Sequence, residues 1–393
     1  MNYQFLPVEY VQYGEDIVQE ELLKQIIMRS AKRVLIVTTK SILGNEAYNG
    51  MLEKIHASQI ETLITLSKQH VPGDLLMKDL KEIKSFNPDL IISCGGGSPI
   101  DAAKILSFVL AEDIQAEDEL YAYSENKQEK KIAMRNYIPN FAIPTTLSAA
   151  EFTGIAGVTN GEDQVKYKFS HLNMTPKQVF LDPVFTRDTP EWLWISTGIR
   201  AVDHAVETLY SPSPNPVNTS LALQALKKLH QNLLLSKRHP ENLAYRLECQ
   251  LGAWLSLFSV VNIKLGLSHS IGHQLGTLYD IPHGMTSAIM LPFVMEFLLP
   301  RTYHEQAQIS EELGFASPGN SVTENAKKAP GLIADLIESL DIPNRLRDFD
   351  VKKESIPELI ENILVDIYAE RNDFVMETES LEEEITRLIY KVW

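Results

Sequence analysis

Three histidines lie close together in the stretch LSHSIGHQLGTLYDIPHG, at His269, His273 and His283. Residues four apart lie on one face of a helix, so a helix here would point His269 and His273 the same way. Pro282 and Gly284 predict that this helix ends and that the chain folds back. Imidazoles can bind a metal ion, transfer a proton or pack as ordinary side chains. The third histidine beyond the helix end makes a chemical role as reasonable as simple packing.

A glycine-rich loop in PDLIISCGGGSPIDAAK is the second candidate for chemistry. A buried strand runs into Gly95–Gly97, and a helix is expected to follow. Ser98 is predicted to be its N-cap and Pro99 its first residue, with Asp101 at the acidic position of a capping box. Glycines let the backbone approach a ligand closely, and the free N–H groups at a helix start suit a phosphate. The loop is predicted to bind pyrophosphate, although it matches neither GxGxxG nor a P-loop, and an ordinary turn is the alternative.

The elements that must position these residues follow two patterns along the chain. Up to about residue 185, apolar runs such as RVLIVTT and ETLITLS alternate with amphipathic helical stretches, as in a parallel sheet covered by helices. The stretch DLLMKDLKEIKSF is expected to form one such helix. Beyond residue 185, long helical patterns such as TGIRAVDHAVETLYS and IPELIENILVDIYAE dominate. We therefore predict an α/β domain over residues 1–185 and an all-helical domain over 186–393. The polar segment 116–131 is expected to be a solvated loop.

Composition narrows the classes of function. A chain of 393 residues suggests two domains, and 44% hydrophobic with 22% charged residues is typical of a soluble globular protein. The net charge of −16 disfavours nucleic acid and anionic lipid as partners. We see no long apolar run and no secretion signal, so no membrane association is expected. Two distant cysteines, Cys94 and Cys249, fit a reduced cytoplasmic compartment.

Five motifs occur along the chain in one order: GGGSPIDAAK, IPTT, DP, TGIRAVDHAVE and the HxxxH…PHG stretch. Together they resemble the iron-containing (group III) alcohol dehydrogenase family, over roughly residues 30 to 295. The resemblance implies a dehydroquinate-synthase-like architecture, in which a dinucleotide-binding α/β domain and a helical domain flank a catalytic cleft. It also implies an NAD(P)-dependent alcohol dehydrogenase or reductase with a small-molecule substrate. We expect a homodimer or a larger homo-oligomer.

The resemblance implies roles for individual residues. Those that would hold the pyrophosphate of NADP or NAD and nearby groups are Gly96, Gly97, Ser98 and Asp101. Thr145 and Thr146 would line the nicotinamide side. The positions that match ligands of Fe²⁺ or Zn²⁺ are His204, His269 and His283. His273 matches a histidine that relays a proton to the substrate, and Lys166 matches the family's cleft lysine.

Arg200 departs from the family's pattern. Metal-dependent members carry an acidic ligand four residues before the histidine that corresponds to His204, and this chain has Arg200 there. A guanidinium has no lone pair for a metal, and it repels a nearby cation by roughly several kcal/mol at an effective dielectric constant of about 20. Arg200 could pair with Asp203 at i,i+3, or it could bind a substrate carboxylate bidentately. Three histidines can hold zinc by themselves, so a metal is weakened and not excluded.

A second departure is the segment IPTTLSAAEFTG, which is two residues shorter before Glu151 than the corresponding loop of metal-dependent members. A short loop and a missing acidic ligand resemble the maleylacetate reductase branch, which works without a metal. We therefore predict reduction of a small carbonyl compound or unsaturated oxo acid, with weak or no metal dependence. One alternative is an Fe²⁺- or Zn²⁺-dependent alcohol dehydrogenase with a three-histidine site. A more remote one is a lyase that resembles dehydroquinate synthase.

The residues after RVLIVT bear on the choice of nucleotide. Sites that select NAD often place an acid there, whereas a basic residue favours the 2′-phosphate of NADP. This chain has Thr39 followed by Lys40. We expect NADP(H) to be accepted, although Lys40 could equally be a solvated lysine at a strand end.

Overall fold

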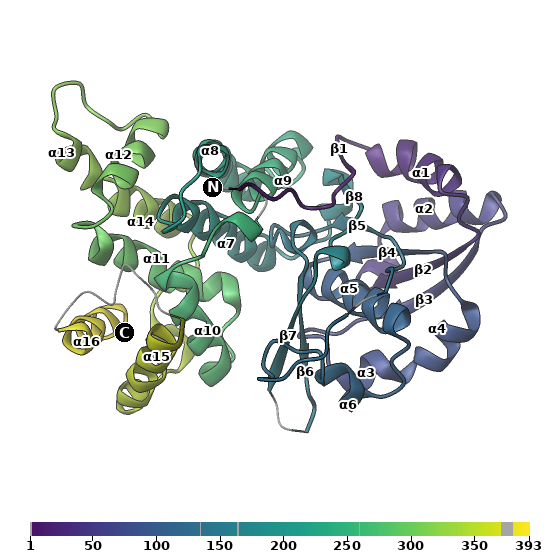
Figure 1. Ribbon diagram of the computed structural model, residues 1–393. Coiled ribbons are helices and arrows are strands. Elements are labelled where there is room, and N and C mark those ends of the chain that lie inside the picture. Colours follow the sequence, from purple (N-terminus) through teal and green to yellow (C-terminus); the bar gives the residue numbers. More distant parts are fainter. Residues whose placement is uncertain (1, 134, 163–164, 259, 371–379) are drawn as a thin grey trace. The chain divides into compact units, whose positions relative to one another are not determined.

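The structure is a computed structural model that describes residues 2–133, 135–162, 165–258, 260–370 and 380–393. It divides into two compact units, Met1–Thr189 and Pro190–Trp393, so the division falls a few residues after the boundary expected at residue 185. The first unit contains a sheet covered by helices, and the second contains helices (Figure 1). This arrangement confirms the predicted fold class.

A parallel sheet of six strands, in the order β1-β8-β5-β4-β2-β3, forms the first unit. Its strands are Tyr10–Tyr13 (β1), Arg33–Thr38 (β2), Glu61–Leu66 (β3), Leu90–Gly95 (β4), Asn140–Pro144 (β5) and Gln178–Leu181 (β8). Strands β2 and β4 are neighbours in this sheet. Strand β3 lies beyond β2 and strand β5 lies beyond β4, so the strand order reverses between β2 and β4. In sheets of this kind, ligands bind at the carboxyl ends of the strands where the order reverses. The glycine loop follows β4 and Thr39 follows β2, so both lie at this point.

Helices cover both faces of the sheet. They are Leu23–Met28 (α1), Glu46–Ala57 (α2), Gly73–Lys78 (α3), Leu80–Phe86 (α4), Gly97–Glu112 (α5) and Glu117–Tyr121 (α6). Side chains alternate along a strand, so Val34 and Ile36 of β2 pack with α1 and α2, whereas Leu35 and Val37 pack with α4 and α5. An antiparallel pair, Ile155–Thr159 (β6) and Lys166–Ser170 (β7), lies outside the main sheet.

Two local predictions in this unit were wrong. The stretch DLLMKDLKEIKSF forms two helices, α3 and α4, which meet at Asp79, where the carboxylate accepts a hydrogen bond from Thr65 Oγ1 at 3.1 Å. The segment expected to be a solvated loop contains α6, because Leu120 and Tyr121 pack into the core.

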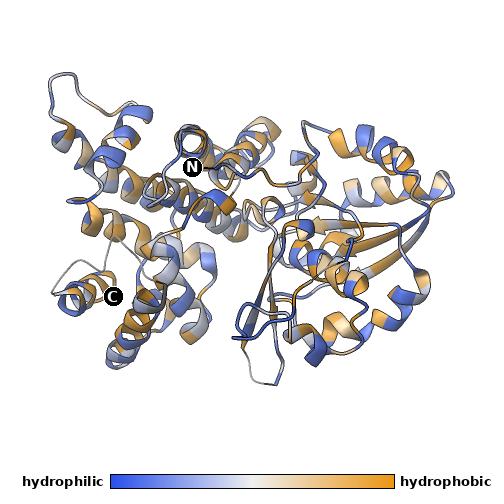
Figure 2. Ribbon diagram, viewed as in Figure 1, coloured by the Kyte–Doolittle hydropathy of each residue, from blue (hydrophilic) through white to orange (hydrophobic). Residues whose placement is uncertain are grey.

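Helices build the second unit over the residues of it that the structure describes. They are Glu191–Leu209 (α7), Pro216–Arg238 (α8), Leu243–Ser256 (α9), Leu267–Tyr279 (α10), His283–Leu298 (α11), Tyr303–Glu312 (α12), Val322–Ala326 (α13), Ala329–Ser339 (α14), Ile356–Glu370 (α15) and Leu381–Val392 (α16). Most residues of α7 and α11 are buried. In the first unit, hydrophobic residues dominate the strands of the main sheet (Figure 2). Among the described residues, no single helix is long and apolar enough to cross a membrane, although the bent pair Leu243–Asn262 and Leu267–Tyr279 meets that criterion together.

Gly284 lies where α11 meets α7. A Cβ atom at this position would come within 2.1 Å of the carbonyl oxygen of Ser196 in α7. The two helices therefore touch through their backbones. The predicted end of the helix within YDIPHG is confirmed, but Gly284 is not the residue that ends it, because Gly284 lies inside α11. Instead α10 ends at Tyr279, and Asp280 follows it with a φ of 53°.

Candidate active site

The glycine loop leaves β4 through Gly95, whose φ of 142° favours glycine. A Cβ atom on Gly95 would lie 2.7 Å from Pro99 Cγ, and one on Gly96 would lie 3.0 Å from Thr146 Cγ2. The backbone therefore passes these neighbours too closely for a side chain. A loop of this shape can approach a ligand with its main-chain N–H groups.

The start of α5 differs from the prediction. The helix begins at Gly97, its N-cap is Gly96, and no side chain caps it. The predicted N-cap at Ser98 and the capping box at Asp101 are wrong, because the sharp turn at Gly95 lets the helix start earlier. The first N–H groups of the helix have no side-chain cap, so they fit the pyrophosphate of a dinucleotide.

Lys104 is the buried cation of this region. Its side chain is 0% exposed, and Nζ donates hydrogen bonds to the carbonyl oxygens of Ala150 (2.6 Å) and Ile155 (2.7 Å) and to Thr153 Oγ1 (3.1 Å). Burial lowers the pKa of Lys104, and the nearby charge of Asp101 opposes this effect. Lys104 thus ties α5 to the segment that carries β6. Its place three residues after Asp101 was the sequence signal that could have suggested the ion pair.

Asp101 contacts two groups of the protein, and the cofactor contact that the resemblance implies stays a prediction. Its Oδ1 lies 3.3 Å from Lys104 Nζ, and its Oδ2 accepts a hydrogen bond from the Gly157 N–H at 3.4 Å. Lys166, on β7, passes over Gly157, because a Cβ atom there would lie 2.4 Å from Lys166 Cε. Asp101 and Gly157 therefore connect the glycine loop with the strand pair that positions Lys166.

The two threonines of IPTT lie against the glycine loop. Both are buried, the Thr145 N–H donates to the Gly95 carbonyl oxygen at 2.9 Å, and the Thr146 hydroxyl lies 3.3 Å from Ser148 Oγ. Glu151 follows in the same segment and is 2% exposed. Burial raises the pKa of Glu151 to about 7.

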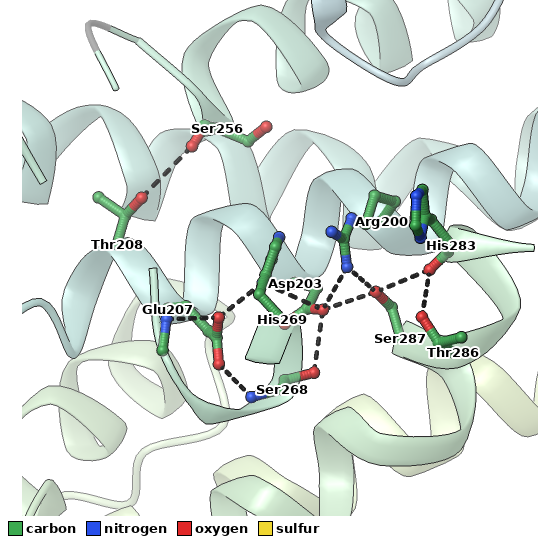
Figure 3. A network of polar contacts seen from close by, with 11 residues as sticks. Arg200, Asp203, Glu207, Thr208, Ser256, Ser268, His269, His283, Thr286 and Ser287 are labelled. Carbon is green, nitrogen blue, oxygen red and sulfur yellow. Dashed lines mark hydrogen bonds and ion pairs between the residues drawn. The ribbon is translucent and has the colours of Figure 1, made fainter. Parts of the chain in front are cut away.

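In the second unit, α7 places Arg200, Asp203 and Glu207 on one face through their i, i+3 and i+7 spacing (Figure 3). Arg200 Nη1 donates to Ser287 Oγ at 3.1 Å and lies 3.6 Å from Asp203 Oδ2. The same Asp203 oxygen accepts hydrogen bonds from Ser287 Oγ (2.6 Å) and Ser268 Oγ (3.0 Å). The predicted ion pair between Arg200 and Asp203 is confirmed.

Glu207 has a role that the sequence reasoning missed. Its Oε2 accepts hydrogen bonds from the Gly266 N–H at 2.7 Å and from His269 Nδ1 at 2.6 Å, and its Oε1 accepts from the Ser268 N–H at 2.6 Å. Burial raises the pKa of Glu207 to about 7 and lowers the pKa of His269 to about 3. Burial therefore favours the neutral imidazole of His269 over its charged form. The acid in TGIRAVDHAVE, one helical turn after His204, was the available signal.

The four histidines form two pairs. The rings of His204 and His269 are stacked with centroids 5.0 Å apart, and those of His273 and His283 meet edge to face at 5.9 Å. His204 Nδ1 and His269 Nε2 are buried and have no hydrogen-bond partner in the part of the chain that the structure describes. His273 lies on α10 and is exposed. His283 is the first residue of α11 and is half-buried.

These residues do not fit a divalent cation as they are arranged. Within the described residues, the one group of three possible ligands whose atoms lie within 4.8 Å of one another is Asp203, Glu207 and His269, and not the predicted set with His204 and His283. Three of its four carboxylate oxygens accept hydrogen bonds from the donors described above, whereas Asp203 Oδ1 is buried without a hydrogen-bond partner among the described residues. Arg200 adds a positive charge at this point, which opposes a cation.

Arg200 is only partly satisfied by the protein. Its side chain is 11% exposed, and Nη1 is the one guanidinium nitrogen with a partner among the described residues. A guanidinium has five N–H donors, so several remain for a ligand. The group can donate hydrogen bonds to a carbonyl or carboxylate oxygen.

The sequence matches two family patterns that together cover most of the chain. Residues 11–183 match "Iron-containing alcohol dehydrogenase", and residues 194–392 match "Fe-containing alcohol dehydrogenase family, C-terminal". Two examples represent the solved structures that share the fold. The 1,3-propanediol oxidoreductase structure has a TM-score of 0.89 at 28% identity, with 100% of both chains covered. The maleylacetate reductase of Agrobacterium tumefaciens has a TM-score of 0.79 at 18% identity, with 100% of this chain and 98% of the other covered.

Three curated relatives are similar over most of their length. The 1,3-propanediol dehydrogenase of Klebsiella pneumoniae is 31% identical, over 85% of this chain and 86% of the relative. The NAD-dependent methanol dehydrogenase of Bacillus methanolicus is 28% identical, over 92% of each chain. The NADPH-dependent butanol dehydrogenase of Clostridium saccharobutylicum is 28% identical, over 74% of this chain and 73% of the relative. The chain therefore belongs to the iron-containing alcohol dehydrogenase family and is an oxidoreductase that uses a nicotinamide cofactor.

Proposed function

We propose that this chain reduces a small carbonyl compound or an unsaturated oxo acid, with weak or no dependence on a metal. The observation that carries the proposal is Arg200. It stands where metal-dependent members have an acidic ligand, it is held by Asp203 and Ser287, and it keeps N–H donors free for a ligand. A fixed cation of this kind can take over the electrostatic role of a metal ion.

The residues of this chain would divide the reaction among them. Bound NAD(P)H would supply the hydride. Arg200 would donate hydrogen bonds to the carbonyl oxygen and stabilise the negative charge that develops there. His273, which is exposed, would deliver the proton that completes the alcohol. We place Lys166 beside the substrate as a further cation, by analogy with the family.

The substrate class follows from the shape of the guanidinium. Arginine can hold a carboxylate through two parallel hydrogen bonds, which favours an oxo acid over a simple aldehyde. The name of the solved maleylacetate reductase gives one such substrate for a protein of this fold. The names of the propanediol and butanol dehydrogenases keep simple alcohols and aldehydes as the second class.

A metal-dependent alcohol dehydrogenase remains the second candidate. Two buried imidazole nitrogens, His204 Nδ1 and His269 Nε2, have no partner among the described residues, and neutral imidazole is a common metal ligand. Rearrangement of the histidine rings would be needed before they could share one ion, because the rings are stacked.

Metal analysis of protein purified without chelator distinguishes the two candidates. We expect metal far below one ion per chain, and NADPH oxidation by oxo acids that survives dialysis against chelator. Stoichiometric iron or zinc, with activity lost on chelation and restored by the metal, would reverse the choice.

Replacement of Arg200 tests whether this residue is the reason for weak metal binding. We expect Arg200→Asp to bind Zn²⁺ or Fe²⁺ more tightly than the wild type, because it supplies a carboxylate and removes a repulsive charge. Arg200→Ala is the control, since it removes the charge without adding a ligand. Equal metal affinity in Arg200→Asp and the wild type would show that Arg200 does not keep the metal out.

A further inference from the structure

Two lysines follow neighbouring strands at one edge of the sheet. Strands β2 and β3 pair in parallel with Thr38 opposite Leu66, and the Ser67 N–H donates to the Thr38 carbonyl oxygen at 2.7 Å. Lys40 and Lys68 each come two residues after these paired positions. Neighbouring strands lie about 4.8 Å apart, so the two lysines begin from adjacent points. Both are exposed, and neither forms an ion pair with any residue that the structure describes.

The two lysines lie in short segments without an acid. The segments VTTKSILGN (37–45) and TLSKQHVPG (65–73) themselves lack Asp and Glu, although Glu46 and Asp74 directly follow them and Asp79 accepts a hydrogen bond from Thr65. The two segments do contain hydroxyl groups, and Thr39 Oγ1 lies 2.9 Å from Ser41 Oγ. Lysines and hydroxyls are groups that bind a phosphate.

Lys68 also lines a crevice with apolar walls. The apolar residues that share the crevice with it include Val37, Val71, Leu76, Ala102 and Leu106. Its wall includes Val71, whose φ of 49° follows a φ of 61° at His70. Left-handed backbone is uncommon for a β-branched residue, and such strain gathers at ligand-binding segments. The crevice has a volume of about 20 Å³, which is room for a water molecule and not for a heterocycle, so it can support the aliphatic stem of Lys68 but does not itself hold the nucleotide.

The position of this crevice relative to the glycine loop identifies the phosphate. The glycine loop follows β4, and β2 lies between β4 and β3. The pyrophosphate is therefore accounted for at β4, and the end of β3 lies two strand spacings away, about 10 Å. The position that selects between NAD and NADP follows β2, which lies between β4 and β3. A second phosphate near the end of β3 therefore corresponds to the 2′-phosphate on the adenosine ribose.

We propose that Lys68, together with Lys40, binds the 2′-phosphate of NADP and makes this chain select NADP over NAD. This assignment rests on one part of the proposed function, namely that the first unit binds a nicotinamide dinucleotide. Lys68 is thus a specificity-determining residue that follows β3, whereas the choice of nucleotide is usually decided by residues that follow β2.

Binding of NADPH and NADH to the full chain, followed by nucleotide fluorescence, tests this assignment without knowledge of the substrate. In Lys68→Ala, the ratio of the NADH to the NADPH dissociation constant should fall about tenfold, the effect of one lost charge-assisted hydrogen bond. In the double variant Lys40→Ala/Lys68→Ala it should fall further. Lys32→Ala is the matched control, because Lys32 is exposed at the opposite end of β2 and its loss should leave the ratio unchanged.

Competition with two fragments sharpens the result. In the wild type, 2′,5′-ADP should displace NADPH more effectively than 5′-ADP, and Lys68→Ala should remove most of this difference. A wild-type chain that binds NADPH and NADH, with a ratio that Lys68→Ala leaves unchanged, would overturn the role of Lys68 and leave the proposed function standing. A wild type that binds neither dinucleotide would overturn both.

Discussion

Each unit of the molecule buries a cation beside carboxylates, and the protein satisfies the two cations to different degrees. Lys104 in the first unit has oxygen partners from Asp101, Ala150, Thr153 and Ile155, and it is 0% exposed. Arg200 in the second unit has one bonded nitrogen among the described residues, and it is 11% exposed. An ammonium has three protons and a guanidinium has five, so only the arginine keeps donors in reserve.

The difference separates a structural charge from a functional one. A buried charge whose donors are all used contributes to the fold, and its removal leaves buried acceptors without partners. A buried charge with free donors is less important to the fold and is available to a ligand. The comparison predicts that Lys104 matters more for stability and Arg200 more for turnover.

The largest effect is expected from Lys104→Met. This change leaves the carbonyl oxygens of Ala150 and Ile155 and the carboxylate of Asp101 without their cation, so the free energy of unfolding should fall by roughly 3–5 kcal/mol. Urea unfolding measures the loss, and Lys81→Met, at an exposed position on α4, is the control. A loss no greater than that of the control would end the distinction between the two cations.

The next effect depends on pH and concerns Glu151, beside Lys104. Burial raises the pKa of Glu151 to about 7 from an ordinary value of 4.5, so the folded protein holds this proton more tightly than the unfolded chain. The stability that the protonated group contributes is complete below about pH 4.5 and is lost as the pH rises through about 7.

Glu151→Gln should therefore change the pH profile of stability. Relative to the wild type, its free energy of unfolding should rise by roughly 3 kcal/mol between pH 4.5 and pH 7.5, because the glutamine does not ionise. Urea unfolding at a series of pH values provides the measurement. Parallel profiles for the two proteins would mean that Glu151 keeps its ordinary pKa and that Lys104 compensates for its burial.

Arg200→Met should lower kcat by about 100-fold, comparable to the loss of one donor that stabilises a developing oxyanion. Its free energy of unfolding should fall less than that of Lys104→Met. Steady-state kinetics with NADPH and the best oxo acid, together with urea unfolding, measure both quantities. Arg200→Lys is the partner variant, because it keeps the charge and loses the planar fork. Full activity with a large loss of stability would place Arg200 in the same structural class as Lys104.

The smallest effect on stability is expected from Gly157→Ala. The new methyl group would meet the flexible end of Lys166 and not the backbone, so the cost should be below about 1 kcal/mol. Lys166 must move aside, and KM for the substrate should rise if this lysine contacts it. Gly161→Ala is the control, because its nearest neighbour would be Asp74 at 3.8 Å. Unchanged KM in Gly157→Ala would exclude Lys166 from substrate binding.

Local patterns in the sequence predicted those parts of the fold and site that depend on neighbours along the chain. The three glycines after an apolar run identified the turn after β4, and the i,i+3 spacing identified the pair of Arg200 and Asp203. The N-cap was wrong because the backbone turn at Gly95 outweighed the side-chain preference of Ser98.

Contacts between distant residues were beyond the reach of these patterns. Lys104 reaches Ala150, which is 46 positions away, and His269 reaches Glu207, which is 62 positions away. The burial of a lysine, or the number of free donors on Arg200, depends on which segments pack around it. The short edge strand β1 and the pair β6 and β7 escaped prediction for the same reason, because each is defined mainly by its partner strand.

The backbone contact of Gly284 with Ser196 has a consequence for motion. Helices that meet through side chains can slide by small rearrangements, but α7 and α11 meet where even a methyl group has no room. The two helices should therefore move together as one rigid body, which preserves the hydrogen bond between Arg200 and Ser287. Amide hydrogens on both sides of the contact should then exchange with solvent at a common, slow rate, set by unfolding of the helix pair as a whole.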